Sequence, residues 1–208
     1  MKNVKMKQNS FIPFRTGTGT DQALVKKIQS LQIGGGGGII PLCKRNGTMC
    51  VMVVYEISKK LWTLPCGKHD AHKTLGETIA AEADEELGFH MGLSKNTPGD
   101  IEKCPLVKLG KGKGTVLAVM FLNADFKRPT VSHQMQKNSK NLLLPSSYRE
   151  VGGLELVEVS EILKCPGGKS ALVPNLVGSG GEKIKHILIS DMCVDAIHAI
   201  SGYNYLSL

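Results

Sequence analysis

The segment TLGETIAAEADEELGF, residues 74–89, constrains this chain more than any other stretch of its sequence. Thr74 and Glu77 have the Ser/Thr-x-x-Glu spacing of a helix capping box, and Gly88 fits the residue that stops a helix. Small apolar residues recur at helical spacing and form a stripe for close packing, at Gly76, Ala80, Ala83 and Leu87. The segment therefore predicts a helix over residues 74–88 that packs closely on the rest of the fold.

A different face of this helix carries three carboxylates, Glu82, Glu85 and Glu86, at positions i, i+3 and i+4. Residues 74–88 contain no Lys or Arg, so no helical i,i+4 partner offsets the repulsion between the acids. Hard cations take oxygen ligands from Asp and Glu. We therefore predict that this face binds Mg²⁺ or Mn²⁺. The alternative is a solvated acidic face, but such a face normally carries Lys or Arg among its acids.

The rest of the chain is strongly basic, because the formal net charge is +8 even with these acids included. A basic protein suits a polyanionic ligand such as phosphate, nucleotide or RNA, although a basic surface can also serve solubility alone. Divalent metals bridge phosphate oxygens and lower the pKa of bound water. The acidic helix and the basic remainder together indicate a phosphoanhydride substrate.

Residues 67–89 resemble the signature of the Nudix hydrolases. That signature runs Gly, five residues, Glu, seven residues, Arg-Glu, an apolar residue, one residue, Glu-Glu, one residue, Gly and an apolar residue. Gly67 falls at its opening glycine, and the end of the signature is matched by Glu82, Ala83, Glu85, Glu86, Gly88 and Phe89. The preceding stretch WTLPCGK also looks like the family's usual lead-in. Two positions depart from the pattern, since Lys73 replaces the first Glu and Ala81 replaces the Arg.

The resemblance implies an α/β fold, a Nudix-like α-β-α sandwich with a mixed, curved sheet. Alternating and buried apolar runs predict strands at residues 49–57, 115–122 and 153–159, with a turn at 45–47 and a last helix at 190–201. We expect residues 1–33 to be an N-terminal extension and residues 34–208 to form the domain. The glycine run at 34–38 fits either a flexible linker or a strand edge that another group approaches closely.

In the family, the metal ligands come mainly from the later Glu cluster, which here is Glu82, Glu85 and Glu86. The resemblance also suggests Glu150 or Glu155, near the predicted strand at 153–159, as the general base. Gly67 and Lys68 would shape the loop beside the phosphates. Glu77 is a candidate to supply the metal ligand that the Lys73 position lacks.

A long polar stretch at residues 123–150 exceeds the usual loop length and is predicted to be a basic inserted loop. Its basic side chains either contact substrate phosphates or belong to a solvated surface. The four candidates for phosphate contact are Lys127, Arg128, Lys137 and Lys140.

The predicted function is metal-dependent hydrolysis of a phosphoanhydride in a nucleotide-like or highly phosphorylated substrate. Candidate substrates are a dinucleoside polyphosphate, a capped RNA 5′ end and a diphosphoinositol polyphosphate. The alternative is a Nudix-like module that has lost catalysis and still binds nucleotide or RNA. No apolar run approaches the ~18 residues of a membrane span, and residues 1–17 lack the apolar core of a signal peptide. We therefore expect an intracellular, cytoplasmic protein without a membrane partner.

Overall fold

The computed structural model describes residues 35–101, 103–110, 114–122, 128–175 and 185–201, and the backbone of residues 11–13. Its strands are β1 (Phe11–Pro13), β2 (Gly36–Arg45), β3 (Thr48–Glu56), β4 (Leu61–Thr63), β5 (Cys66–Lys68), β6 (Leu106–Leu109), β7 (Thr115–Leu122), β8 (Val151–Glu158), β9 (Ala171–Pro174) and β10 (His186–Ile189). Its helices are α2 (Leu75–Ala83), the π-helix η1 (Asp84–Gly88), α3 (Phe89–Met91), α4 (Pro98–Ile101), α5 (Arg128–Ser139), the 3-10 helix η2 (Ser146–Arg149), α6 (Val159–Leu163) and α7 (Asp191–Ser201).

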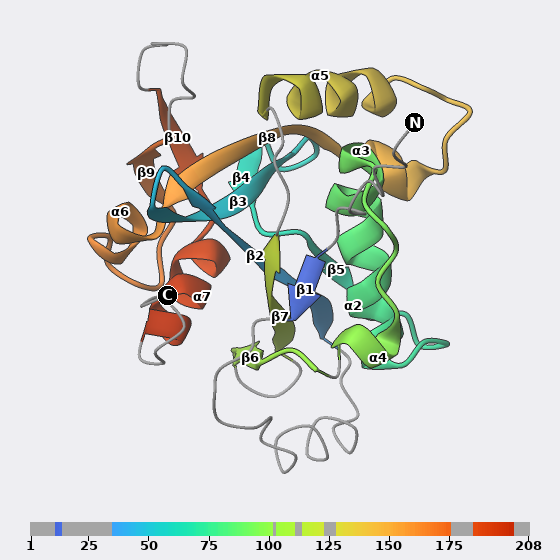
Figure 1. Ribbon diagram of the computed structural model, residues 1–208, viewed down its shortest axis with the longest axis horizontal. Coiled ribbons are helices and arrows are strands. Elements are labelled where there is room, and N and C mark those ends of the chain that lie inside the picture. The colour runs from blue at the N-terminus through green and yellow to red at the C-terminus, as the bar shows by residue number, and fades with distance from the viewer. Residues whose placement is uncertain are drawn as a thin grey trace, which may run out of the picture.

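The strands form one mixed sheet in the order β1-β7-β2-β3-β4-β10-β9, with β5 beside β2, β6 beside β7 and β8 beside β3. The β2–β7 and β4–β10 pairs are parallel, and the other pairs are antiparallel. Helices α2 and α4 lie on one side of the sheet, and α6 and α7 lie on the other (Figure 1). This is the predicted α-β-α sandwich.

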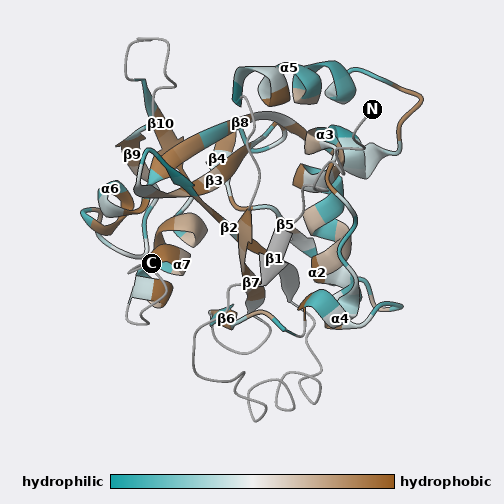
Figure 2. Ribbon diagram, in the orientation of Figure 1, coloured by the Kyte–Doolittle hydropathy of each residue, from teal (hydrophilic) through white to brown (hydrophobic). Residues whose placement is uncertain are grey.

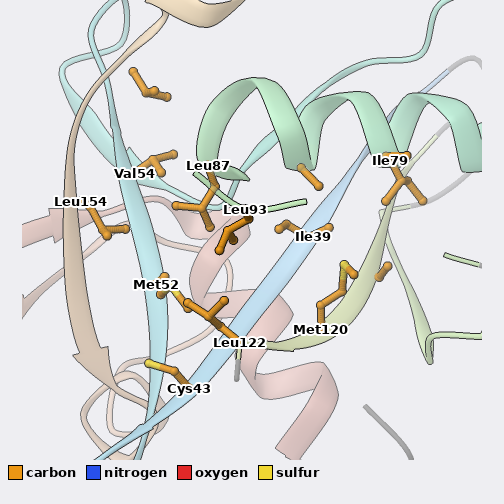
Figure 3. Close-up of a cluster of buried hydrophobic side chains, with 14 of the residues drawn as sticks. Ile39, Cys43, Met52, Val54, Ile79, Leu87, Leu93, Met120, Leu122 and Leu154 are labelled. Carbon is orange, nitrogen blue, oxygen red and sulfur yellow. The ribbon is translucent and has the colours of Figure 1, made fainter. Parts of the chain in front are cut away.

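The central strand β3 is apolar along most of its length because both faces of the sheet are covered. Met52 and Val54 pack into a core under α2 and α5, whereas Val51 and Val53 pack into a second core under α6 and α7. This alternation follows from the two-residue period of a strand. In the first core, Ile79 and Leu87 of the α2–η1 helix point down onto the sheet (Figure 3).

The predicted turn before β3 is a two-residue hairpin turn at Asn46 and Gly47, with φ of 50° and 81°. Two successive positive φ values are typical of the type I′ turn that Asn-Gly favours. The glycine run enters β2, and Gly36–Gly38 pair with β5 on one side and β7 on the other. A Cβ atom on Gly38 would lie 2.3 Å from the carbonyl oxygen of Pro65. These glycines therefore belong to the sheet and permit close approach of the chain that leads into β5.

The predicted helix begins where expected but continues beyond Gly88, so the predicted stop is wrong. Gly88 has a helical φ of −59° and lies buried inside the helix. The helix instead ends at Gly92, whose φ is +65° and whose N–H donates to the carbonyl of Phe89. A glycine in the left-handed region is the usual way to end a helix. The π-helical turn over η1 carries the chain past Gly88 and moves the end by one turn.

The segment predicted as a basic inserted loop contains helix α5, which lies along β8 (Figure 1). Val131 and Met135, four residues apart, are buried against the first core. The Ser132 hydroxyl donates to the carbonyl of Leu154, 2.8 Å away, and accepts from its N–H at 3.0 Å. Figure 2 shows that the helix is largely hydrophilic. Its narrow apolar stripe gives a weak helical pattern, and its packing on β8 is what stabilises it.

Of the predicted extension, the structure describes strand β1, which pairs antiparallel with β7 at the edge of the sheet. The strands predicted at 115–122 and 153–159 correspond to β7 and β8, and the last predicted helix corresponds to α7. Within the described residues, no helix is both long enough and apolar enough to span a membrane.

Candidate functional site

Five carboxylates from three parts of the fold gather beside the α2–η1 helix. Glu82 comes from α2, and Glu85 and Glu86 come from η1. Glu56 ends β3, and Glu150 directly precedes β8. The N–H of Ile57 donates to the carbonyl of Glu150 over 3.0 Å, which brings the ends of these two strands together. The structure therefore adds Glu56 to the predicted carboxylates.

Burial and mutual repulsion raise the pKa values of three of these acids, Glu82, Glu86 and Glu150. The pKa of Glu82 rises to about 7, chiefly because the side chain is desolvated and then because Glu85 and Glu150 carry like charge. Burial likewise raises the pKa of Glu86 well above its ordinary value, with a further contribution from Glu82. The pKa of Glu150 is raised first by partial desolvation of its exposed side chain and then by Glu56 and Glu85. The acids are thus close enough to disfavour one another's ionised forms.

The loop that leads into the helix is tied to the same acids. The backbone N–H of Cys66 donates to Oε2 of Glu86 over 2.8 Å. A Cβ atom on Gly67 would lie 2.1 Å from Oε1 of Glu82, so the glycine leaves the space that this carboxylate occupies. A side chain at position 67 would therefore collide with the Glu82 carboxylate. The loop at Cys66 and Gly67 thus contacts both Glu86 and Glu82 directly.

Two lysines supply positive charge near the acids. Lys59, in the β3–β4 turn, places its Nζ 2.8 Å from Oε2 of Glu56, and its charge opposes the rise in the pKa of Glu150. Lys73, which stands where the family has its first Glu, opposes the rise in the pKa of Glu82. The opening departure from the signature therefore brings a cation near the acid cluster.

Glu77 has a different position from the other predicted metal ligands. Its carboxylate accepts hydrogen bonds from the N–H and the hydroxyl of Thr74, at 2.7 and 2.9 Å. The Thr74 hydroxyl in turn accepts from the N–H of Glu77, which completes the predicted capping box. Glu77 is exposed at the first turn of α2, and these bonds assign it to helix capping.

The structure separates the two candidates for the general base. Glu155 pairs with Val53 of β3, whose side chain packs into the second core, so Glu155 faces away from α2. Its carboxylate forms an ion pair with Arg128 at the start of α5 and accepts from Asn175 Nδ2 at 3.0 Å. Glu150 is the candidate that lies with the acid cluster.

The predicted basic contacts are dispersed. Arg128 is engaged by Glu155, as described above. Lys137 and Lys140 are exposed near the end of α5, Lys68 is exposed at the end of β5, and Lys127 lies outside the described residues. Of these, Lys68 lies on the loop beside the acids. The four of these residues that the structure describes do not converge as a set.

The donor set fits a hard divalent cation in its chemistry, because the gathered side chains are carboxylates whose repulsion a cation would relieve. Within the described ranges, no three His, Cys, Asp or Glu side chains are already grouped so that they could hold one metal ion. One oxygen of Glu86 is engaged by Cys66, and Glu82 fills the space above Gly67. The side chains that would bind a cation are present, and their carboxylate ends would have to converge on it.

Sequence reasoning missed Glu56 and the structural role of the π-helix. The only available signal for Glu56 was its place as a lone acid at the end of an apolar strand, next to the stretch that resembles the family's lead-in. A π-helical turn inside an α-helix has no comparable sequence pattern, although such turns are frequent at functional sites. Here it carries Glu85 and Glu86.

No family model matches this sequence, and no curated protein does. Among solved structures, the chain is similar to an Ap4A hydrolase from C. elegans, with 16% identity, a TM-score of 0.39 and coverage of 64% of this chain and 86% of that one. It is also similar to a MutT/nudix family protein from Enterococcus faecalis, with 12% identity, a TM-score of 0.42 and coverage of 91% and 71%. A third similar structure is the NUDIX domain of NrtR from Shewanella oneidensis, complexed with ADP ribose. It has 12% identity and a TM-score of 0.43, and the match covers 88% of this chain and 97% of that one.

Proposed function

We propose that this protein is a metal-dependent pyrophosphohydrolase that cleaves a diphosphate linkage in a nucleotide-like or highly phosphorylated substrate. The observation that supports this most directly is the cluster of Glu82, Glu86 and Glu150, three carboxylates whose pKa values are raised together. Such a cluster destabilises the fold unless something offsets its charge. A divalent cation would do so, and it could bind substrate phosphates at the same time.

Glu82, Glu85 and Glu86 would hold Mg²⁺ or Mn²⁺. When bound, such a metal neutralises phosphate oxygens and lowers the pKa of a coordinated water. The chain's own contribution is to position these acids. The bond from the Cys66 N–H fixes Glu86 against the loop, and the missing side chain at Gly67 makes room for Glu82. Lys68, exposed beside that glycine, can contact the phosphates.

Glu150 is the proposed general base. Its position before β8 and its electrostatic contact with Glu85 support this role, whereas Glu155 is engaged by Arg128 and Asn175. A carboxylate with a raised pKa accepts a proton more readily near neutral pH than an ordinary one. Glu150 would take the proton of the attacking water and return it to solvent, because its side chain lies at the surface.

The proposal is tested by incubating the protein with a panel of phosphoanhydrides and Mg²⁺ or Mn²⁺ and separating the products by chromatography. The panel includes a dinucleoside polyphosphate, a capped RNA and a diphosphoinositol polyphosphate. Glu85→Gln and Glu86→Gln should each reduce turnover by about two orders of magnitude or more, because an amide keeps the shape and loses the charge. The control is Glu161→Gln, which removes an acid of α6 that pairs with Lys164. Full activity in both Glu variants would overturn the metal assignment.

A second candidate function is a binding module without catalysis. The observations that favour it are the cation at Lys73, where the family has an acid, and the engagement of Glu77 in helix capping. This second function would be supported if the protein bound a nucleotide or RNA tightly in the presence of Mg²⁺ and hydrolysed no member of the panel.

A further inference from the structure

The side chain of Glu150, the proposed general base, has no hydrogen-bond or ion-pair partner among the residues that the structure describes. Its position therefore depends on the backbone that carries it. Glu150 follows η2 directly and is the last residue before β8. On the β8 side, its carbonyl accepts the bond from the N–H of Ile57. On the other side, the chain is a four-residue 3-10 helix in which no residue is buried.

One side-chain hydrogen bond ties this short helix to the acid-bearing helix. The Tyr148 hydroxyl donates to Oδ2 of Asp84 over 2.9 Å. Asp84 is buried at the start of η1, so this bond reaches into the fold from a helix that is otherwise at the surface. The Tyr148 ring also meets the ring of Phe89 edge to face, with centroids 4.7 Å apart. Since hydrogen bonds to a carboxylate are stronger than those between neutral groups, Tyr148 anchors η2 on η1.

Asp84 has a second partner, Lys95, whose Nζ lies 3.3 Å from the same oxygen. The side chain of Lys95 is 75% exposed. An exposed ion pair contributes little, because water screens the charges and the long side chain loses freedom. The bond from Tyr148 is thus the stronger of the two contacts. Asp84 stands at a position that the Nudix signature leaves unspecified, so the resemblance gives it no role.

The bond between Tyr148 and Asp84 joins the two segments that carry the proposed catalytic groups. Asp84 is followed directly by Glu85 and Glu86, the proposed metal ligands of η1. Tyr148 precedes Glu150 by two residues. After desolvation and the effect of Asp84, the negative charge of Glu85 contributes to a raised pKa of the Tyr148 hydroxyl. A general base must lie within hydrogen-bond reach of the water that it deprotonates, so a displaced segment lowers the rate.

We propose that the bond between Tyr148 and Asp84 positions Glu150 for proton transfer beside the metal ligands. This inference rests on the proposed function and makes Tyr148 and Asp84 positioning residues that contact neither the metal nor the reacting atoms. Tyr148→Phe tests it with the smallest change, because phenylalanine keeps the ring and loses only the hydroxyl. Without the bond, η2 is held less firmly and Glu150 spends less time within reach of the attacking water.

The kinetic test is a double-mutant cycle of Tyr148→Phe and Glu150→Gln on the phosphoanhydride that the wild type hydrolyses best. Tyr148→Phe should lower kcat of the wild type by about tenfold, which is part of the roughly 10²- to 10⁴-fold that a general base contributes. In the Glu150→Gln background the same change should cost less than about twofold, because the residue that it positions is already disabled. KM and the affinity for Mn²⁺ should not change. Equal losses in both backgrounds, or no loss in the wild type, would overturn the proposal.

The matched control is Tyr55→Phe, which removes the hydroxyl of a tyrosine on β3 whose ring lies 5.3 Å from that of Trp62. This variant should retain the kcat of the wild type. A loss as large as that in Tyr148→Phe would show that the hydroxyl of Tyr148 has no particular role in positioning the base.

Amide hydrogen exchange tests the placement of Glu150 without turnover, because the N–H of Ile57 bonds to the Glu150 carbonyl. Tyr148→Phe should accelerate exchange of the Ile57 amide by about fivefold or more, since a less firmly held partner opens more often. The Ser190 amide, which bonds to the carbonyl of Trp62 over 2.8 Å, is the internal reference and should exchange at an unchanged rate.

These two readouts keep the proposals distinguishable. If the wild type is inert on every phosphoanhydride and the Ile57 amide still exchanges faster in Tyr148→Phe, the hydrolase proposal fails and the hold of Tyr148 on Glu150 stands. If the wild type turns over a substrate and the exchange of Ile57 is unchanged, the positioning proposal fails alone. Unchanged exchange in an inert protein would overturn both.

Discussion

The carboxylate of Glu82 occupies the space in which a side chain on Gly67 would lie, since a Cβ atom there would be 2.1 Å from Oε1. The two residues are 15 positions apart in the chain and belong to β5 and α2. Position 67, which corresponds to the opening glycine of the signature, must therefore lack a side chain if the Glu82 carboxylate is to keep its place.

Gly67→Ala should displace the carboxylate of Glu82 while leaving the fold intact. The atom that the new methyl group meets is the end of a flexible side chain, so the strain is relieved by rotating that side chain. We expect kcat/KM to fall at least tenfold and the thermal midpoint to change by only a few degrees. Kinetics and calorimetry measure these two quantities.

The matched control is Gly99→Ala in α4, where a Cβ atom would meet nothing closer than Thr97 Oγ1 at 3.8 Å. This variant should retain wild-type activity. Gly67→Ala with unchanged kcat/KM would contradict the steric pairing of residues 67 and 82.

Without metal, stability should fall as the pH rises, because the folded-state pKa of Glu82 is about 7, above its ordinary value of 4.5. The folded protein therefore favours the protonated acid. This stabilising contribution is fully present below about pH 4.5 and is lost as the pH rises through 7. Glu82→Gln should remove this part of the pH dependence and raise the thermal midpoint at pH 8 in the presence of a chelator.

The comparison is made by calorimetry of the wild type and Glu82→Gln between pH 4 and pH 8. Mg²⁺ should stabilise the wild type more at pH 8 than at pH 6, because binding requires the ionised acid. If the thermal midpoints of the two proteins changed in parallel between pH 4 and pH 8, ionisation of Glu82 would not contribute to the pH dependence of stability.

Lys59→Gln should strengthen the binding of Mn²⁺ by several-fold, because it removes a positive charge that pairs with Glu56 and acts on Glu150. Calorimetric titration with Mn²⁺ measures this directly. Lys164→Gln is the matched control, because Lys164 also pairs with a Glu three residues earlier and is equally exposed, at 68% against 66%. Equal Mn²⁺ affinities in the two variants would show that Lys59 does not act on the site.

Glu77→Ala should lower the thermal midpoint and leave the Mn²⁺ affinity unchanged. The substitution removes the acceptor for the N–H and hydroxyl of Thr74, and a lost capping box destabilises the first turn of a helix. Glu77→Gln should have a smaller effect, because an amide oxygen can still accept these bonds. A loss of Mn²⁺ affinity in Glu77→Ala would instead support Glu77 as the metal ligand that the Lys73 position lacks.

The sequence by itself determined the features that depend on neighbours along the chain. The capping box of Thr74 and Glu77, the helical spacing of Glu82, Glu85 and Glu86, and the turn at Asn46 and Gly47 all rest on local geometry, so a short window contains the required information. The resemblance to the Nudix signature is of the same kind. The sequence wrongly predicts that the helix ends at Gly88. The π-helical turn that extends it to Gly92 has no recognisable pattern in the local sequence.

Only the tertiary structure decided which distant residues share the site. Glu56 and Glu150 meet because β3 and β8 are paired, Arg128 meets Glu155 because α5 lies on β8, and Gly67 meets Glu82 because β5 packs beside α2. Each contact depends on how strands and helices pack, and the two-residue period of β8 decides which face Glu155 takes. Long-range packing therefore assigns Glu150 to the acids and Glu155 to an ion pair, although both are equally plausible bases by their place in the sequence.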